Sequence, residues 1–537
     1  MAISIAVVVL SAIIGVSTWI LWRLLNPSIA ELDLPYLQFD DGDNSEDKYK
    51  TQSRSILSRG YKEYLKHDKP FCIRNPVDKD RPIVVLPFKY LDEVKRAPDN
   101  RLSLPLHLQK NSILNHIGGP EMSDEVIHAA KLSLNRALDR LTERLQEECV
   151  AVFSQALPET HDWTTIHLYP IFLQAFARMS ARVLVGPELR DQWQTLSLGY
   201  VSTVLKAPSV VRAKYRPSLF WLAKFLEPDV KEVYKYRKQA AELLEPTIKS
   251  RLSKAKLGKQ STAGEAQEKP EDAIQWLLDA HLAKGRVPTP DDIVQNLFVL
   301  TTASIHSTSA TGLSILFDTM DRPSVVADIK AEMSRVRRTC ERHVSEDGID
   351  TAVWTRQHLS KLNFLDSFMR ESMRVHSFTQ LTVQRLVASK PYTFKDGLTL
   401  PAGTTISFAS NEYNLDPEIH SNPHASIFDP KRHVEKDKLK LHFASTEDTI
   451  VWGSGSHACP GRFFAQDALK IMLVFLMRRY TFKFQSEGKE TGEEGKGRPA
   501  DMPMNFNIVP NVMAPVLFKI NETGDVADIV GDHVGYM

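Results

Sequence analysis

The chain has 537 residues, of which 42% are hydrophobic and 25% are charged, so it has ample material for a folded core. Its formal net charge of +1 excludes a global electrostatic field that would recruit nucleic acid, and no nucleic-acid partner is expected. The four cysteines lie far apart and form no CxxC pair, which excludes the usual spacing of a zinc site and a disulfide framework.

An uncharged apolar stretch opens the chain: "ISIAVVVLSAIIGVSTWILW" precedes Arg23, the first charged residue. A helix over residues 3–25 would rise about 33 Å, enough to cross a bilayer core. No basic residue precedes the stretch, so a retained transmembrane anchor is favoured over a cleaved signal peptide. Arg23 on its C-terminal flank favours a cytosolic location for the rest of the chain.

The remaining boundaries follow from composition. Residues 26–48 contain Pro27, Pro35 and the polar run "FDDGDNSED", and are predicted to be a linker. The folded domain is predicted to span residues 49–520, followed by a tail over residues 521–537.

Helical patterns dominate this domain, which we expect to be mainly α with a smaller β portion. The clearest helix begins at "TPDDIVQNLFVL", with Thr289 as N-cap and Pro290 at the first helical position, and extends to Met320. Its middle, "TTASIHSTSAT", carries seven hydroxyl side chains. Two interpretations stay open: these hydroxyls bond back to helix carbonyls and bend the helix, or they form a polar notch at a buried site.

A β-rich region follows residue 375. In "LTVQRLV", alternation places Leu381, Val383, Arg385 and Val387 on one face of a strand. An arginine in line with aliphatic residues is costly to bury unless an anion meets it. The Asp-Gly dipeptide inside "YTFKDGLTLPAGTTISF" predicts a β-hairpin.

The stretch "VWGSGSHACPGRFFAQDAL" surrounds Cys459 with glycines and leads into a predicted helix. Gly453 and Gly455 permit a tight turn, and Gly461 permits the close approach of a large planar group. The helix N-terminus and nearby N–H groups favour a thiolate, which suits a nucleophile or a single metal ligand. Haem iron takes one protein thiolate because the porphyrin supplies four other ligands. A buried structural cysteine is the alternative, and the density of glycines argues against it.

This loop resembles the haem-binding loop of the cytochrome P-450 superfamily at Trp452, Gly455, Cys459 and Gly461. The family usually has phenylalanine in place of Trp452 and a basic residue in place of His457. The resemblance implies that Cys459 is the axial ligand of the iron of haem b (iron protoporphyrin IX). It implies that Trp452, Gly455 and Gly461 contact the same cofactor. It also implies that His457 forms a hydrogen bond with a propionate.

Further motifs support the resemblance. "FLDSFMRESMRVHS" contains Glu371 and Arg374 on one helix face, a spacing that a solvated ion pair shares. The resemblance implies the structural E-x-x-R pair of the family, which meets the arginine of an F-x-P-x-R pattern. "FDPKRH" supplies that arginine as Arg432. The resemblance also gives Arg385 its anion, a haem propionate.

Family members use an acid followed by threonine for proton delivery. Aligned with that pattern, "ASIHST" places His306 at the acid and Ser307 at the threonine, followed by Thr308, and these three are the expected catalytic residues. For His306 the alternative is a hydrogen bond to the backbone or to a propionate. In "DEVIHAAKLSLNRAL", His128 or Lys131 is expected at a propionate, and each also suits the surface of an amphipathic helix.

The resemblance implies a P-450 fold and a membrane-anchored monooxygenase, single-pass in the endoplasmic reticulum membrane with a cytosolic catalytic domain. Electrons would come from NADPH through NADPH–cytochrome P-450 reductase, with cytochrome b5 as a second donor, and oxygen from O2 would enter an apolar substrate. "HACPGRFFA" and "ASIHSTS" resemble fungal secondary-metabolism members, especially those like ent-kaurene oxidase, so a terpenoid or another fungal secondary metabolite is expected.

The resemblance places residues 101–120, 195–235, 298–309, 375–383 and 509–514 around the substrate. Two alternatives stay open. One is a haem-thiolate enzyme that catalyses rearrangement or dehydration without the oxygenase cycle. The other is a non-enzymatic membrane-anchored protein with a structural Cys459.

Overall fold

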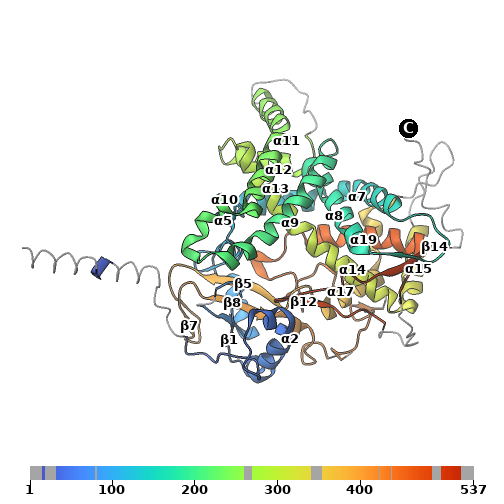
Figure 1. Ribbon diagram of the computed structural model, residues 1–537. Helices are drawn as coiled ribbons and strands as arrows, with labels where there is room; N and C mark the ends of the chain where they lie inside the picture. The colour runs from blue at the N-terminus through green and yellow to red at the C-terminus, as the bar shows by residue number, and fades with distance from the viewer. Residues whose placement is uncertain are drawn as a thin grey trace, which may run out of the picture.

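The computed structural model of the protein describes residues 15–17, 32–78, 81–258, 269–339, 353–421, 424–436, 438–485 and 497–521. Helices form most of the molecule, and the largest sheet lies at one end of it, beside α2 (Figure 1). This arrangement confirms a mainly α fold with a smaller β portion.

The α-helices are α2 (Glu46–Glu63), α3 (Leu91–Arg96), α4 (Leu104–Ser112), α5 (Leu114–Ile117), α6 (Asp124–His128), α7 (Leu134–Ala156), α8 (Leu168–Val185), α9 (Arg190–Lys214), α10 (Ala223–Leu226), α11 (Pro228–Gly258), α12 (Ala273–Ala283), α13 (Pro290–Ser304), α14 (His306–Met320), α15 (Pro323–Arg338), α16 (Arg356–Ser360), α17 (Asn363–Val375), α18 (Ser410–Asn414) and α19 (Arg462–Arg479). Short 3-10 turns are η1 (Leu65–His67), η2 (Phe88–Tyr90), η4 (Pro217–Leu222) and η5 (Gly455–His457), and η3 (Ala129–Ser133) is a π-helical turn.

The strands are β1 (Phe71–Ile73), β2 (Ile83–Val85), β3 (Leu102–Ser103), β4 (Thr164–Ile166), β5 (Leu381–Val387), β6 (Tyr392–Thr393), β7 (Thr399–Leu400), β8 (Thr405–Ala409), β9 (Val434–Glu435), β10 (Lys438–Leu439), β11 (Tyr480–Phe484), β12 (Met502–Met504), β13 (Asn507–Val509) and β14 (Val516–Ile520). In the part of the chain that the structure describes, the largest sheet has the order β1-β2-β8-β5-β3, and a second sheet has the order β11-β14-β4.

The predicted anchor over residues 3–25 lies outside the described residues, except for the helical residues 15–17. Among the residues that are described, no helix has the length and hydropathy needed to cross a membrane. The predicted linker over residues 26–48 extends too far. Leu37 and Phe39 are buried against Tyr49, and α2 begins at Glu46, because apolar side chains inside the polar run pack into the folded body.

The long predicted helix begins as expected. Thr289 and Asp292 form a capping box, in which each side chain accepts from the other residue's backbone N–H, and Pro290 is the first helical residue. The helix is not continuous to Met320, however, because it breaks at Ile305 into α13 and α14. This break falls inside the hydroxyl-rich stretch.

The strand "LTVQRLV" forms as β5, at the centre of the largest sheet. Its alternation is interrupted by a bulge between Thr382 and Arg385, where Val383 has a φ of +52°. The prediction of four residues on one uninterrupted face was therefore wrong, because a bulge changes which face a side chain reaches. The predicted hairpin forms as β6 and β7, and Gly397 provides the positive φ of +95° that its turn requires.

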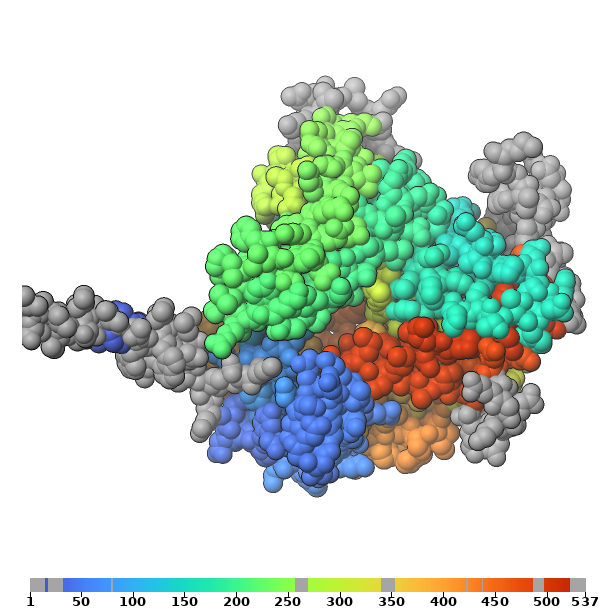
Figure 2. Space-filling model, in the orientation of Figure 1, coloured from blue at the N-terminus to red at the C-terminus, as the bar shows by residue number. Residues whose placement is uncertain are grey.

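A core of apolar side chains joins α7, α8, α14, α15, α17 and α19, and a second one joins α9, α11, α12 and α13. In the space-filling view, the blue part of the chain with α2 lies below the green part with α9 and α11, and the red C-terminal part lies to the right (Figure 2). Helix α19, which follows Cys459, packs against α7 and α14. The cysteine loop therefore leads directly into the larger core.

Candidate functional site

The cysteine loop is shaped by two glycines with left-handed backbone. Gly453 and Gly455 have φ values of +74° and +65°, which other residues rarely adopt. A Cβ at Gly455 would lie 2.7 Å from the carbonyl oxygen of Lys95, so both backbone angle and space require glycine there. The predicted tight turn is confirmed.

Trp452 and Arg462 hold the loop in place. Trp452 Nε1 donates to the carbonyl of Phe443 at 2.8 Å, and its own carbonyl accepts from the backbone N–H of Cys459 at 2.6 Å. Arg462, the first residue of α19, donates to the carbonyl of Cys459 at 2.8 Å and to that of Ala444 at 3.1 Å. The loop around the sulfur is therefore held on both sides of Cys459.

Cys459 itself is half-buried just before α19. Burial raises the pKa of its thiol, while the backbone N–H groups of Gly461 and Arg462 and the Arg462 guanidinium act in the opposite direction. Because the effect of burial outweighs the effect of these donors, the surroundings of Cys459 favour the predicted thiolate only in part. A bound metal cation deprotonates a coordinating thiol outright, which makes this sulfur well suited to a metal.

Gly461, two residues after Cys459, lies next to open space. Gly461 has an ordinary φ of −87°, so its backbone does not require glycine. A Cβ added there would meet nothing within 4 Å, so the loop leaves room at this position. The close approach of a planar group at Gly461 stays a prediction, which this open position allows.

Arg385 lies buried, at 2% exposure, in β5. One terminal nitrogen donates to the carbonyl of Gln384 at 2.8 Å, while Nε and the other terminal nitrogen have no partner among the described residues. Burial lowers the pKa of Arg385 to about 10, and Asp99 opposes this effect. An unpaired buried cation is costly, so the site is built for an anion, such as a carboxylate of a porphyrin.

Two more donors border the same loop. His457 Nε2 lies 3.0 Å from Asp99 Oδ1, and burial lowers the pKa of His457, with the charges of Arg385 and Lys131 adding to the effect. Lys131, in the π-helical turn η3, donates to the carbonyl of Ser456 at 2.5 Å. His128 is exposed, and its side chain makes no hydrogen bond or ion pair in the described part of the chain. Lys131 is therefore the better-placed of the two predicted residues, and a propionate contact of His128 stays a prediction.

The predicted structural triad is present in full. Arg374 binds both carboxylate oxygens of Glu371 at 2.7 and 2.8 Å, and Arg432 Nε binds one of them at 3.0 Å. The Glu371 side chain is 0% exposed and both guanidiniums are 4% or less. The solvated ion pair that the spacing also allowed is therefore excluded for this site.

A residue next to the triad was missed. Arg370, 2% exposed, donates to the carbonyls of His442 and Ser445 at 2.8 and 3.0 Å, and to that of Glu447 at 2.5 Å. It thereby fixes the segment that leads into the cysteine loop. The signal was a second cation in "MRESMR", directly before Glu371, which the E-x-x-R pattern does not include.

Back-bonding is confirmed for three hydroxyls of the helix, and a polar notch at a buried site stays a prediction. The hydroxyls of Ser304, Ser307 and Ser309 donate to the carbonyls of Thr301, Ala303 and Ile305 at 2.7–3.2 Å, as back-bonding predicts. The hydroxyls of Thr301 and Thr302 are buried without a partner in the described residues. The stretch therefore both disturbs the helix and leaves polar groups inside the protein.

The predicted proton-delivery residues lie at the start of α14. His306 Nδ1 is 3.2 Å from the hydroxyl of Tyr169 on α8, a partner that the sequence did not reveal. Burial lowers the pKa of His306 and raises that of Tyr169. Thr308 is buried and lies one turn before Gly312, where a Cβ would be 3.0 Å from Leu469 and Met472 of α19. Thr308 thus shares the helix face that points to α19, the helix that follows Cys459.

A cavity of ≈ 200 Å³ lies beside Gln384, between α4, the largest sheet and the β12–β13 turn. Its polar lining includes His107, Lys110, Asn111, Gln384, Asn505 and Asn507. His107 Nε2 is 3.1 Å from Gln384 Oε1, and burial lowers the pKa of His107 to about 4, so the ring is neutral. Of the five segments predicted to surround the substrate, 101–120 and 375–383 contribute residues to the lining of this cavity. The other three segments contribute none.

Comparison with known proteins agrees with this geometry. A family model described as cytochrome P450 matches residues 107–500. The chain is 37% identical over 495 residues to the cytochrome P450 monooxygenase cheE of Chaetomium globosum, covering 90% of this chain and 91% of that protein. It is 34% identical over 517 residues to the cytochrome P450 monooxygenase ccsG of Aspergillus clavatus, covering 95% and 97%. It is 34% identical over 472 residues to the pyrichalasin C-7 hydroxylase of Pyricularia grisea, covering 87% and 88%.

These relatives confirm the fungal secondary-metabolism type of the superfamily and do not test the finer likeness to ent-kaurene oxidase, which stays a prediction. Monooxygenases and a hydroxylase among them also decide against the rearranging and the non-enzymatic alternatives. With a thiol between Trp452 and α19, a buried guanidinium that needs an anion, and an intact E-x-x-R triad, the chain belongs to the cytochrome P450 family and is a haem-thiolate monooxygenase.

Proposed function

We propose that this chain hydroxylates a C–H bond of a secondary metabolite, with electrons from NADPH delivered by a membrane-bound cytochrome P450 reductase. The observation that carries the proposal is that the same fold holds a free thiol at Cys459 in the glycine-rich loop and a buried guanidinium at Arg385 that lacks an anion. A hydroxylase among the relatives, named for C-7 of pyrichalasin, supports the reaction type.

The chain's residues have distinct tasks in this reaction. Cys459 Sγ would bind the haem iron, and the Arg385 guanidinium, the His457 ring and Lys131 Nζ would bind the propionates. Haem held by a thiolate supplies the activation of O2, from which one oxygen atom enters the substrate and the other leaves as water. The tryptophan and Arg462 contacts keep the sulfur in place.

Proton delivery is assigned to the start of α14. Because burial raises the pKa of Tyr169, its phenol stays protonated and donates to His306 Nδ1. Because burial lowers the pKa of His306, the ring is neutral near pH 7 and holds its proton on Nε2. The hydroxyls of Ser307 and Thr308 lie next in the chain and can pass a proton on, directly or through an ordered water.

The cavity lining supports a substrate that is not a pure hydrocarbon. Amide side chains of Asn111, Gln384, Asn505 and Asn507 face the same space as the neutral ring of His107. Buried polar groups need hydrogen-bond partners, so a metabolite with oxygen or nitrogen atoms suits this wall better than an unsubstituted terpene. The substrate of the pyrichalasin hydroxylase is the first compound to try.

Membrane attachment completes the proposal. The apolar sequence of residues 3–25 supports a single-pass anchor in the endoplasmic reticulum membrane. Trp221, Phe225 and Leu226, each 55–57% exposed between α9 and α11, support a second contact with lipid. Cytochrome b5 is a further proposed electron donor.

The test uses purified full-length enzyme, a cytochrome P450 reductase, NADPH, the substrate of the pyrichalasin hydroxylase and ¹⁸O₂. We expect a product heavier by one ¹⁸O atom, with NADPH consumed in proportion. The Tyr169→Phe variant is informative because it removes only the hydroxyl that orients His306. It should release more hydrogen peroxide per NADPH while keeping its haem. Product formed without NADPH, or product oxygen taken from water, would contradict the proposal.

A further inference from the structure

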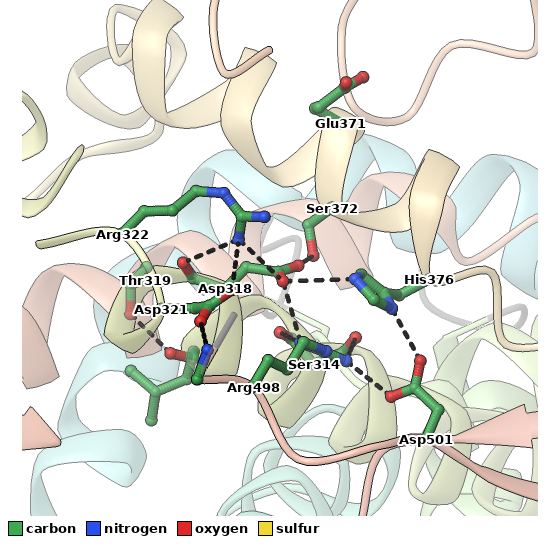
Figure 3. A network of polar contacts seen from close by, with 12 residues as sticks. Ser314, Asp318, Thr319, Asp321, Arg322, Glu371, Ser372, His376, Arg498 and Asp501 are labelled. Carbon is green, nitrogen blue, oxygen red and sulfur yellow. Dashed lines mark hydrogen bonds and ion pairs between the residues drawn. The ribbon is translucent and has the colours of Figure 1, made fainter. Parts of the chain in front are cut away.

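A buried group of charged side chains joins the end of α14 to the end of α17 and to the segment before β12 (Figure 3). We call it the His376 cluster; its members are Asp318, Asp321, Arg322, His376, Arg498 and Asp501. Residues from three separate parts of the chain meet here: Asp318 and Arg498 are 180 positions apart in sequence. None of its members belongs to the cysteine loop or to the E-x-x-R triad.

His376 caps the C-terminus of α17, and both of its ring nitrogens face carboxylates. Nδ1 lies 2.7 Å from Asp501 Oδ2, and Nε2 lies 3.4 Å from Asp318 Oδ1. A neutral imidazole has one nitrogen without a proton, and in either tautomer that nitrogen would face a carboxylate oxygen. The imidazolium form donates to Asp501 and brings a positive charge to within ion-pair distance of Asp318, so the geometry fits a charged ring.

Arg498 ties the same carboxylates to α14. It donates to the Ser314 carbonyl at 2.7 Å and hydroxyl at 2.9 Å, to Asp318 at 3.1 Å and to Asp501 at 2.8 Å. Ser372 of α17 donates to the other oxygen of Asp318 at 2.5 Å. Asp318 is 0% exposed, so each of these contacts is shielded from water.

The cluster's charge balances only with a protonated His376. Among the described residues, three carboxylates and two guanidiniums meet here, since Arg322 lies 3.4 Å from both Asp318 and Asp321. The imidazolium brings the net charge to zero, and a neutral ring leaves one negative charge in excess. Uncompensated buried charge is strongly destabilising, so this histidine is a required part of the cluster.

The cluster lies at the base of the β12–β13 hairpin. Asp501 directly precedes β12, and the tip of the hairpin, formed by Asn505, Phe506 and the first residue of β13, Asn507, lines the cavity beside Gln384. The segment after His376 holds the other end: Gln380 N–H donates to Phe506 O, and Ile508 N–H donates to Phe378 O, both at 2.8 Å. A hairpin fixed at base and tip by one segment cannot shift without moving the cavity wall.

We propose that His376 is a positioning residue, whose imidazolium fixes the base of the β12–β13 hairpin and thereby sets the shape of the substrate cavity. It acts through Asp501 and Asp318 and touches neither substrate nor cofactor. The proposal rests on the proposed function for one point, that this cavity receives the substrate.

The test measures hydrogen–deuterium exchange of the haem-loaded full chain. His376→Asn leaves the cluster one positive charge short, and we expect the protection factors of the amides in residues 502–509 to fall about tenfold or more. Strand β14 (Val516–Ile520), which belongs to another sheet, should keep its protection. His161→Asn changes an exposed histidine outside the cluster and is the matched control. Unchanged protection of the hairpin in the His376 variant would overturn the proposal.

A second variant separates charge balance from simple loss of a contact. Adding Asp501→Asn to His376→Asn removes one negative charge and restores neutrality, so we expect the double variant to regain at least half of the lost protection, on a logarithmic scale. If the loss of protection in the double variant equals the sum of the losses in the two single variants, the role of charge is overturned. If His376→Asn does not fold, Asp501→Asn alone carries the test, because it removes the 2.7 Å partner. Unchanged protection there would equally refute the proposal.

Turnover gives an independent readout. With the substrate of the pyrichalasin hydroxylase, His376→Asn should raise KM about tenfold and change kcat less, because it alters binding and not the reacting groups. A fall in kcat with unchanged KM would contradict a positioning role. Absence of turnover in the wild-type enzyme, with the exchange results as expected, would refute only the proposed substrate.

Discussion

Replacing Arg385 with methionine should have opposite effects on the haem-free and the haem-loaded protein. The guanidinium is 2% exposed, and two of its nitrogens have no partner in the described structure. Burial lowers the pKa of Arg385 to about 10. Relative to an ordinary value of about 12.5, this lowering corresponds to roughly 3 kcal/mol against folding at neutral pH. Because a base with a lowered folded-state pKa is destabilising while charged, the cost persists below about pH 10 and disappears only above it.

Methionine removes this cost, so the haem-free variant should be about 1–3 kcal/mol more stable than wild type in urea denaturation. Haem should be lost faster, by about tenfold to a hundredfold, because a propionate then has no guanidinium partner. Transfer of haem to excess apomyoglobin measures that rate. Arg385→Lys keeps the charge but not the planar fork, so it should lose haem at a rate between those of the wild type and the methionine variant. A methionine variant that is less stable without haem, and that retains haem as well as wild type, would show that Arg385 is structural and not a propionate ligand.

Four further changes test the site and the anchor. Cys459→Ser should abolish turnover and the thiolate-type Soret band of the reduced carbon monoxide complex, because an alkoxide is a poor substitute for a polarisable sulfur ligand. Glu371→Ala leaves two buried guanidiniums uncompensated and should cost about 3–5 kcal/mol in urea denaturation, whereas Glu46→Ala, in an exposed pair with Lys50, should cost under about 1 kcal/mol. Ser307→Ala with Thr308→Ala should raise the hydrogen peroxide released per NADPH, and an unchanged ratio would place the proton route elsewhere. Deleting residues 1–22 should release the protein to the soluble fraction with its haem content unchanged, and persistent membrane binding after a carbonate wash would point to the exposed Trp221 region.

Local signals predicted the parts of the structure that local chemistry determines. The caps of α13 and the turn at Gly453 and Gly455 follow from neighbouring residues, so they were readable from the sequence. The Glu371–Arg374 pair was readable because both residues lie on one turn of a helix. Such features depend on a few consecutive φ and ψ angles or on helical spacing.

Long-range contacts were not readable in this way. Tyr169 meets His306 across 137 positions, and Lys131 meets Ser456 across 325. No periodicity or turn signal in a single sequence states which side chains such distant segments bring together. The sequence left a bend in the hydroxyl-rich stretch as one of two interpretations. It did not place the break at Ile305, because tertiary packing decides at which residue the helix is interrupted. The His376 cluster belongs to the same class.

The predicted alignment places His306 where the family usually has a carboxylate, and an imidazole suits the surroundings of this residue better than a carboxylate would. Its hydrogen-bond partner is a phenol that burial keeps protonated, and no ion pair of His306 exists in the described structure. A buried carboxylate at this position would lack a counter-charge, whereas a neutral imidazole needs none. The same ring accepts on one nitrogen and donates on the other, so it can pass a proton and return to its starting charge. The departure from the family pattern therefore removes a buried charge from the notch while retaining a group that can relay protons.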